Sequence, residues 1–417
     1  MKSKAPKDIL FLCQFFYPEH NSSATLPFDT AKYLASHGFL VGGMVGYPKE
    51  YSDEKNLPLE ETVDNVAIRR IRYIQMNRAK TLGRLVNYFS FTFSVWLRRS
   101  YLKNYKAVIV YSNPPVLPVI PLQVKKKYGT KMVYVAYDVY PEVAYASHSL
   151  TPGSMISRVM NRINNRLYSM VDCVVALTDE MKEFLLENRP QLTRDRVVTI
   201  ANWAHEGVSL PGRSMHERFG CRDGQFVVAY FGNLGICQDV ETMLDAAGLL
   251  KDDDRVRFLI AGHGNKWDRV EGRIRSEGLE NVKLFGFLTG EDFQQAVAIS
   301  SCYIVTLEKE LKGTCAPSKY YSYLQGGKPV VVVAEEGSYL LEEVEREEIG
   351  CSVKLGDAAA LRDAVLSMMD HPKECAEMGR RAKTLYEEKY SYDTAMKKYA
   401  SVMTEKCGIK GSADTTA

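Results

Sequence analysis

A chain of 417 residues exceeds what one hydrophobic core usually fills, so we expect two domains of about 200 residues each. Its nine cysteines form no C-x-x-C pair, a pattern typical of reduced thiols in a cytosolic protein and not of a disulfide framework or zinc site. The net charge of +3 is unevenly divided: residues 1–200 hold 27 Lys and Arg against 17 Asp and Glu, and the remainder holds 27 against 34. The two halves are therefore expected to meet different partners.

The first half alternates between short apolar runs and segments with helical spacing, which predicts βαβ units on a parallel sheet. Its opening run resembles a signal peptide but stops at Tyr17-Pro18 without a small-residue cleavage site, so we interpret it as a buried strand. No apolar run reaches the roughly 18 residues of a membrane span. The predicted strands are 8–16, 40–46, 66–71, 107–111, 132–136, 173–177 and 197–200, and the predicted helices are 25–37, 82–102, 118–127, 154–169 and 179–187.

The same alternation restarts after a polar stretch at 207–223. The predicted strands are 226–231, 256–261, 282–285 and 302–306, and the predicted helices are 240–250, 267–277 and 290–298. The expected fold class is α/β, with two Rossmann-like domains in tandem. We expect the domains at 1–205 and 206–389, a C-terminal helix at 390–407 and a disordered tail at 408–417.

The stretch from Pro317 to Val333 has the layout of a phosphate-binding helix. Proline suits the first helical turn, and Ser318 and Lys319 place a hydroxyl, an ammonium and free N–H groups at the positive end of the helix dipole. Gly326-Gly327 ends the helix, and the valine run that follows is typical of a buried parallel strand. This pattern predicts an anion site, phosphate above all.

Two glycine-containing loops follow predicted strands of the second domain, where ligands of open α/β sheets bind. The first is Gly232-Asn233-Leu234-Gly235 and the second is Gly262-His263-Gly264. Either loop alone is more typical of a tight turn between a strand and a helix. Both loops, at the same sheet edge as the helix beginning at Pro317, favour a nucleotide diphosphate.

Across nearly the whole chain, these motifs resemble those of family 4 retaining glycosyltransferases of the GT-B fold, especially bacterial cell-surface polysaccharide enzymes of the fucosamine-transferase type. The motifs are FYPE (16–19), DVYPE (138–142), IANW (200–203), GNLG (232–235), AGHGN (261–265), FGFL (285–288) and PSK with GGKPVVV (317–333). The resemblance implies transfer of a sugar from a nucleotide sugar, UDP-linked above all, bound in a cleft between the domains. It also implies that the C-terminal helix, with its stripe of Ala395, Tyr399 and Met403, returns to the first domain.

The resemblance implies a donor site in the second domain. The expected donor-binding residues are Gly232, Asn233, Leu234, Gly235, Gly262, His263, Gly264, Pro317, Ser318, Lys319 and Ser322. The chain departs from the broad family where two glutamates are usual, since Thr314 and Ser322 stand there. Asn233 and Gln238 replace the usual arginine and lysine of the glycine-rich loop, which leaves Lys319 as the expected cation for the diphosphate.

In the first domain we expect the acceptor and two catalytic carboxylates. Asp138 and Glu142 follow a predicted strand, where one of them could orient or deprotonate the acceptor hydroxyl while Lys319 stabilises the leaving group. The alternative is that Asp138 caps a turn and Glu142 is a surface charge. The expected acceptor-binding residues are Glu19, Asn21 and Ser22. Tyr137 stands where a histidine often precedes the aspartate in the family.

A basic aromatic segment predicts contact with an anionic membrane surface, such as the cytoplasmic face of a membrane that carries a polyprenyl-diphosphate acceptor. Residues 69–106 hold ten Lys and Arg and no acid, and residues 143–171 place three arginines at helical spacing, again without an acid. Alternatively, the aromatic helix is buried in its own domain. The expected membrane residues are Arg84, Phe89, Phe91, Phe93, Trp96, Arg98 and Arg99.

Other ligand classes are less favoured by the sequence. We expect no metal and no cofactor, because the histidines lack ligand spacing and the D-x-D at Asp252–Asp254 lies between a helix end and a strand start. No nucleic-acid module is recognisable, and the second half is acidic. Besides a glycosyltransferase with a lipid-linked or oligosaccharide acceptor, two functions remain open. They are a GT-B nucleotide-sugar epimerase and a non-catalytic partner of another glycosyltransferase.

Overall fold

The computed structural model describes residues 6–49, 56–77, 81–204 and 216–412, which form two compact units. Unit 1 comprises Met1–Asn202 with two short later segments, Gly313–Ala316 and Asp393–Ala417. Unit 2 comprises Trp203–Lys312 and Pro317–Tyr392. The chain thus leaves unit 2 for four residues just before the Ser318 helix and then returns to it.

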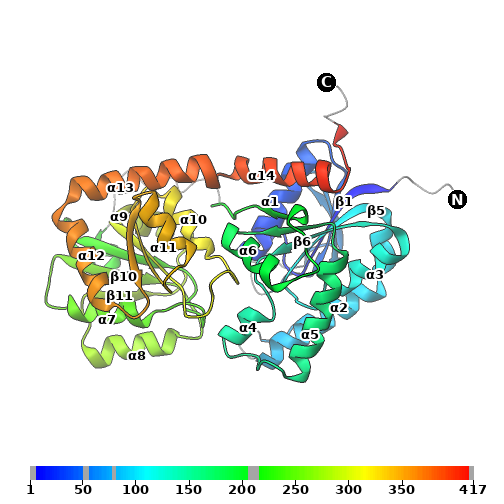
Figure 1. Cartoon of the computed structure of the whole chain (residues 1–417). Coiled ribbons are helices and arrows are strands. Elements are labelled where there is room, and N and C mark those ends of the chain that lie inside the picture. Colours follow the sequence, from blue (N-terminus) through cyan, green and yellow to red (C-terminus); the bar gives the residue numbers. More distant parts are fainter. Residues whose placement is uncertain (1–5, 50–55, 78–80, 205–215, 413–417) are drawn as a thin grey trace. The chain divides into compact units, whose positions relative to one another are not determined.

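Unit 1 is built on an eight-stranded sheet in the order β3-β4-β2-β1-β5-β6-β7-β8, parallel except for the β3–β4 pair (Figure 1). The strands are β1 (Lys7–Cys13), β2 (Val41–Gly46), β3 (Glu60–Val63), β4 (Val66–Ile71), β5 (Tyr105–Tyr111), β6 (Lys131–Ala136), β7 (Cys173–Ala176) and β8 (Val197–Thr199). The helices are α1 (Ser22–Ser36), α2 (Thr81–Leu97), α3 (Val119–Tyr128), α4 (Glu142–Ala146), α5 (Met155–Met170) and α6 (Asp179–Asn188). The central strands are apolar along their length because helices cover both faces of a parallel sheet.

One face of this sheet carries a single hydrophobic core to which α2, α3, α5 and α6 all contribute. Phe91 and Val95 of α2, together with Leu167 of α5, are almost fully buried against strand residues such as Leu10 and Val108. The opposite sides of α2 and α5 remain in solvent. This arrangement fixes which side chains of the basic aromatic helix reach the surface.

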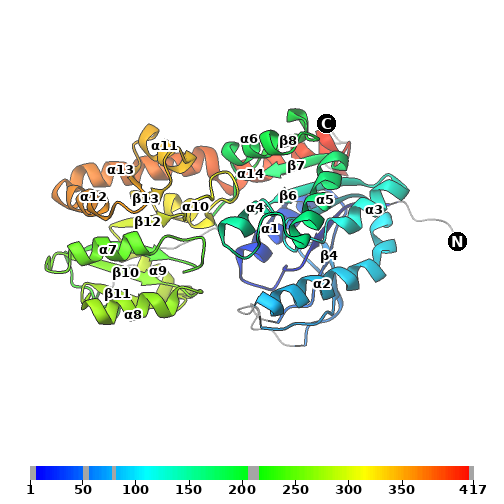
Figure 2. The same cartoon turned by 60° about the horizontal axis from the view of Figure 1, so that its bottom comes forward.

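Unit 2 has a six-stranded parallel sheet in the order β11-β10-β9-β12-β13-β14, with helices on both faces (Figure 2). The strands are β9 (Phe226–Phe231), β10 (Val256–Ala261), β11 (Val282–Phe285), β12 (Cys302–Thr306), β13 (Val330–Ala334) and β14 (Gly350–Lys354). The helices are α7 (Glu241–Leu249), α8 (Trp267–Glu277), α9 (Gly290–Ile299), α10 (Ser318–Gln325), α11 (Tyr339–Arg346), α12 (Ala358–Asp370) and α13 (Pro372–Leu385). The strand order reverses between β9 and β12, which is the switch point where such sheets bind ligands.

The C-terminal segment packs within unit 1. Helix α14 (Tyr392–Ser401) buries Ala395 and Tyr399, and Lys406 donates to the Asp195 carbonyl at 2.8 Å. From the sequence, residues 408–417 are expected to be disordered, but Gly408–Ser412 are ordered. The reason is tertiary packing: Ile409 is buried, and the Ser412 N–H donates to the Gly38 carbonyl at 3.0 Å.

The structure also changes several expected element boundaries. Between the predicted strands 40–46 and 66–71 the structure adds β3, which pairs antiparallel with β4. The helix expected at 82–102 ends at Leu97 and is followed by a 3-10 turn at Arg99–Asn104. Within the described ranges, no helix is long and apolar enough to cross a membrane.

Candidate functional site

Three loops of unit 2 meet at the carboxyl ends of its central strands. The loop after β9 begins at Gly232, the loop after β10 begins at Gly262, and α10 begins after Pro317. The Gly232 N–H donates to the Ala261 carbonyl at 2.9 Å, and the Leu234 N–H donates to the His263 carbonyl at 3.0 Å. The two glycine loops therefore form one hydrogen-bonded surface beside the switch point.

The backbone of these loops leaves no room for side chains at two glycines. A Cβ at Gly262 would lie 1.8 Å from the Gly232 carbonyl oxygen, and one at Gly264 would lie 2.4 Å from the Leu234 carbonyl oxygen. Gly232 itself has φ +140°, in the region that favours glycine. These residues were predicted from sequence as donor-binding, and the structure brings them together.

Lys319, in the first turn of α10, places an amine on this surface. Its Nζ donates to the Tyr230 hydroxyl at 2.5 Å and lies 3.7 Å from the centre of the Tyr230 ring. The Tyr230 hydroxyl donates in turn to the Asn233 carbonyl at 2.8 Å. A Cβ at Gly232 would lie 3.5 Å from Lys319 Nζ, so the ammonium sits directly beside the first glycine loop.

Burial lowers the pKa of Lys319 to about 7. Removing the ammonium from water disfavours its charged form, because a hydroxyl and an aromatic ring replace only part of its hydration. Residues with strongly shifted pKa values are common at functional sites. Lys319 has such a pKa and lies at the sheet edge beside the first glycine loop. An arriving phosphate would restore the charged form.

The other predicted donor residues line the same surface with less burial. Ser318 and Ser322 of α10 are exposed, as are Asn233 and His263, whose ring centre lies 4.8 Å from that of Trp267. Leu234 is fully buried and packs under the loop, so its side chain belongs to the core and only its backbone faces the site. The Gly235 N–H donates to Gln238 Oε1 at 3.1 Å.

Sequence reasoning missed a second lysine at this edge. Lys266 follows the second glycine loop, donates to the Gln238 carbonyl at 2.7 Å and pairs with Glu308, which follows β12. The pair joins the loops after β9, β10 and β12. Its position one residue before α8 was a usable signal, because cations near glycine loops often bind anions.

In unit 1, Asp138 and Glu142 lie after β6 but in different environments. The Asp138 N–H donates to Ser112 Oγ at 3.1 Å, and Asp138 forms an isolated antiparallel bridge with Cys315. Burial raises the pKa of Asp138 to about 6. By contrast, both carboxylate oxygens of Glu142 accept from Arg189 Nη2 at 2.7 Å, so Glu142 already holds a cation of its own unit.

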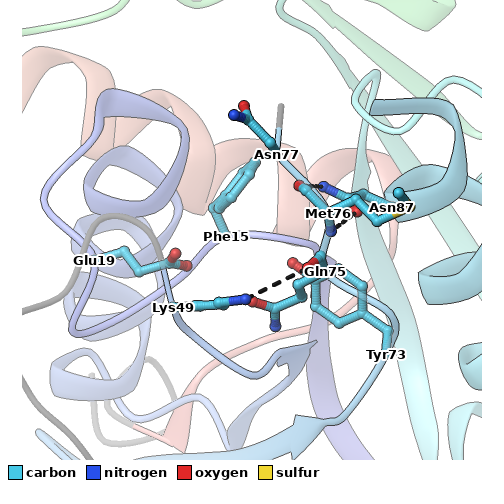
Figure 3. A pocket seen from close by; sticks show the side chains of 8 residues that line it. All are labelled: Phe15, Glu19, Lys49, Tyr73, Gln75, Met76, Asn77 and Asn87. Atoms are coloured by element: carbon cyan, nitrogen blue, oxygen red, sulfur yellow. Dashed lines mark hydrogen bonds between the residues drawn. The ribbon is translucent and has the colours of Figure 1, made fainter. Parts of the chain in front are cut away.

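The predicted acceptor residues lie where β1 gives way to α1. Glu19 is buried, Asn21 precedes α1 without a side-chain capping bond, and Ser22 is the first helical residue. Glu19 lines a cavity of about 300 Å³ at the carboxyl ends of β1, β2 and β4 (Figure 3). Its eight lining residues are Phe15, Glu19, Lys49, Tyr73, Gln75, Met76, Asn77 and Asn87.

The structure contradicts one of the predicted membrane residues, Phe91. Phe91 is fully buried, and its ring packs edge-on against Tyr73 with ring centres 5.3 Å apart. Phe89 and Phe93 are 58% and 59% exposed, and Trp96 is 37% exposed with the Arg99 guanidinium 4.3 Å from its ring centre. Arg84 is partly exposed, and Arg98 and Arg99 are exposed.

Two of the three aspartates at Asp252–Asp254 form ion pairs with arginines. Asp253 pairs with Arg255 at 2.6 Å, and Asp254 pairs with Arg222 at 3.0 Å. Across the described parts of the chain, no three His, Cys, Asp or Glu side chains cluster as a metal site.

Comparison with known proteins relates this geometry to a family. Residues 213–385 match the family model described as "Glycosyl transferases group 1". The "Probable glycosyltransferase WbjE" of Pseudomonas aeruginosa is 26% identical over 330 residues, 78% of this chain and 80% of that protein. The "Putative colanic acid biosynthesis glycosyl transferase WcaI" of Escherichia coli is 21% identical over 264 residues, 61% of this chain and 64% of that protein.

Solved structures agree on the fold. The crystal structure of Anabaena HepE in complex with UDP superposes with a TM-score of 0.67 at 17% identity, covering 95% of this chain and 99% of that one. The fold is therefore GT-B, as the sequence motifs imply. At the level of group 1 glycosyltransferases, the family resemblance is also supported.

Proposed function

We propose that this protein is a retaining glycosyltransferase that moves a sugar from a UDP-sugar to a lipid-linked or oligosaccharide acceptor in bacterial surface polysaccharide synthesis. The observation that carries the proposal is the position of the Lys319 ammonium, which lies beside Gly232 at the start of α10. Diphosphate oxygens placed here would meet an ammonium, helix N–H groups and a glycine backbone at once. The UDP bound to HepE supports this donor class, and the names of the relatives support glycosyl transfer.

In the proposed reaction, the bond between the sugar C1 and the diphosphate oxygen breaks, and a bond from C1 to the acceptor oxygen forms on the same face of the ring. Negative charge develops on the leaving diphosphate, and Lys319 with the α10 N-terminus stabilises it. The acceptor hydroxyl loses its proton as the new bond forms. Asp138, with a pKa of about 6, is mostly ionised at pH 7 and is proposed to orient that hydroxyl or take its proton.

We further propose that unit 1 rests on an anionic membrane surface, on the cytoplasmic side. Helices α2, α3 and α5 contain no acidic residue, and α5 exposes Arg158, Arg162 and Arg166. The same helices expose apolar side chains, including Phe89 and Phe93 of α2 and Met155 of α5, which is 82% exposed. Cations attract anionic headgroups while apolar side chains enter the interface, so the combination suits a peripheral protein.

The donor proposal is tested by calorimetry with UDP and UMP. Lys319→Met is expected to weaken UDP binding by about 1.5–3 kcal/mol, the usual contribution of a hydrogen bond to a charged group. UMP binding should change less, because UMP lacks the second phosphate. Lys251→Met, an exposed lysine after α7, is the matched control and should bind UDP as the unmodified protein does.

Equal UDP affinity in the Lys319→Met and Lys251→Met proteins, with both folded, would place the diphosphate elsewhere. Sugar transfer is then assayed with radiolabelled UDP-sugars and bacterial membrane lipids. Interconversion of the UDP-sugar without any acceptor would instead support an epimerase.

A further inference from the structure

Glu343, on α11, keeps its side chain almost entirely out of water. The residue is 2% exposed, and a buried carboxylate is stable only where donors replace its lost hydration. Its Oε2 accepts from the Tyr320 hydroxyl at 2.9 Å, and its Oε1 accepts from the Tyr390 hydroxyl and from Lys389 Nζ, both at 2.5 Å. The carboxylate therefore joins α11 to α10 and to the π-helical turn Tyr386–Tyr390, which follows α13.

The two oxygens of Glu343 serve different parts of unit 2. Burial raises the pKa of the Tyr320 and Tyr390 hydroxyls, so both remain protonated donors to the carboxylate. Oε1 also lies 3.5 Å from Arg346 Nη2, so loss of the Tyr390 hydroxyl would leave this oxygen paired with cations. Loss of the Tyr320 hydroxyl, by contrast, would remove this hydrogen bond between the carboxylate and α10.

Helix α10 is short, so its anchors decide where its first turn lies. It has eight residues, fewer than a helix needs to be stable without tertiary contacts. The Tyr323 hydroxyl accepts from the Phe231 N–H at 2.7 Å and donates to the Phe231 carbonyl at 3.0 Å. Because Phe231 directly precedes Gly232, Tyr323 fixes the later part of α10 to the first glycine loop. Tyr320 fixes the first turn to Glu343.

The position of Lys319 depends on this first turn. Lys319 and Tyr320 are neighbours in the chain, and consecutive helical residues point about 100° apart. Tyr320 is fully buried on the side of Glu343, whereas Lys319 Nζ lies 3.7 Å from the centre of the Tyr230 ring, beside Gly232. A hydrogen bond to a phosphate weakens steeply once the ammonium moves from its best distance and direction. Anchoring Tyr320 therefore fixes where an anion can meet Lys319.

We propose that Glu343 is a positioning residue, which holds the first turn of α10 through Tyr320 so that Lys319 meets the diphosphate of the donor. The inference rests on the proposed UDP-sugar site and adds to it a residue with almost no surface to offer the donor. If Glu343 merely stabilised unit 2, removal of the Tyr320 hydroxyl or of the Tyr390 hydroxyl would have the same kind of effect.

The test compares Tyr320→Phe with Tyr390→Phe, a matched pair. Each change removes one buried hydroxyl that donates to Glu343 and keeps the ring, so both should lower the melting temperature by similar amounts. In calorimetry, UDP affinity should fall about fivefold in Tyr320→Phe and stay unchanged in Tyr390→Phe. UMP affinity should change less than twofold in both. Glu343→Gln should weaken UDP binding about threefold, because its amide has one oxygen for both sides of the network.

A second measurement follows Lys319 without any ligand. Lysines labelled with ¹³C at Cε are titrated by NMR between pH 6 and 10, and the signal missing from Lys319→Met identifies Lys319. In Tyr320→Phe the pKa of Lys319 should rise from about 7 towards that of an ordinary lysine, because the first turn no longer holds the amine in its buried position. In Tyr390→Phe it should not change.

The two measurements separate this inference from the donor proposal. If the unmodified protein binds UDP, unchanged UDP affinity in Tyr320→Phe, or an equal loss in both tyrosine variants, would overturn the positioning role alone. If it does not bind UDP, the donor proposal is rejected, and the Lys319 titration decides the positioning role. A pKa that rises only in Tyr320→Phe would then retain that role, and equal pKa values in the two variants would overturn it.

Discussion

The carboxyl edges of the two sheets have related topologies but carry different kinds of residue. In unit 2 the loops after β9 and β10 contain four glycines, and the backbone forms the surface beside Lys319. In unit 1 the loop after β1 contains no glycine between Gln14 and Asn21, and large side chains such as Phe15 and Glu19 form the surface. The edge of unit 2 therefore offers backbone N–H groups, which suit an anion such as phosphate, whereas the edge of unit 1 offers side chains.

The largest expected effect comes from removing the backbone approach in unit 2. In Gly262→Ala the added Cβ would lie 1.8 Å from the Gly232 carbonyl oxygen, at φ +158°. We expect a loss of about 2–4 kcal/mol in the free energy of unfolding, and no measurable UDP binding. Gly272→Ala, on α8 with no atom within 4 Å of the added Cβ, should be neutral or slightly stabilising. Identical thermal melting of the two variants would show that the loops are not tightly packed.

The next largest expected effect is the pH dependence of UDP binding, which tests the proposed role of Lys319. Since the pKa of Lys319 is about 7, the amine is mostly neutral at pH 8.5, and a bound diphosphate would favour the protonated form. Binding should therefore take up close to one proton, and UDP affinity should fall about tenfold, or about 1.4 kcal/mol, per pH unit between 7.5 and 9. Calorimetry in two buffers of different ionisation enthalpy measures the uptake. It should vanish in Lys319→Met, and proton uptake that persists there belongs to another group.

The membrane proposal concerns unit 1 alone and is tested by sedimentation with liposomes. Replacing Arg98 and Arg99 by Glu should abolish binding to vesicles that contain anionic lipid, because each cation near such a surface contributes about 1 kcal/mol. Binding by the unmodified protein should also fall as salt rises. Arg275→Glu and Arg380→Glu together form the matched control, because both are exposed in unit 2. Equal binding to neutral and anionic vesicles would contradict the proposal.

The smallest expected effect is on the free energy of unfolding, whose pH dependence has opposite sign for the carboxylates of Asp138 and Asp253. The pKa of Asp138 is raised, so the folded protein holds that proton more tightly, and the free energy of unfolding falls as pH rises from about 4 to 6. Asp138→Asn should therefore stabilise the protein by about 1 kcal/mol above pH 6 and have little effect at pH 4. Asp253, whose pKa is lowered by Arg255, should show the opposite, with Asp253→Asn destabilising at pH 7. Melting temperatures at both pH values check the signs.

The meeting of the glycine loops and the start of α10 in unit 2 could be predicted from sequence because its requirements are local. The glycines of the two loops and the proline at the start of α10 can each be recognised within a few consecutive residues. The cavity of unit 1 could not be predicted in the same way, because its lining comes from four separate segments, and only the fold brings Lys49, Tyr73 and Asn87 together. The only sequence signal for this cavity was the expectation that Glu19 binds the acceptor.

Two incorrect predictions, the exposure of Phe91 and the disorder of residues 408–412, also have physical explanations. Phe89, Phe91 and Phe93 alternate by two, but successive residues of an α-helix turn by about 100°, so Phe91 must face away from the other two. Helical phase alone would have assigned it to the core. Ile409 is a single large apolar residue in a polar tail, and nothing local shows that it is buried or that the Ser412 N–H donates to the Gly38 carbonyl.

The return of Gly313–Ala316 to unit 1 has a practical consequence for dissecting the protein. The Val139 N–H donates to the Thr314 carbonyl at 2.8 Å, and the Gly313 N–H donates to Glu180 at 2.9 Å, so this tetrapeptide completes the unit 1 fold from within the second half of the sequence. A gene fragment that ends at Asn202 encodes a unit 1 without its tetrapeptide and without α14. Unit 1 is therefore not encoded by one continuous fragment, whereas a fragment of residues 203–392 would hold all of unit 2 together with the tetrapeptide.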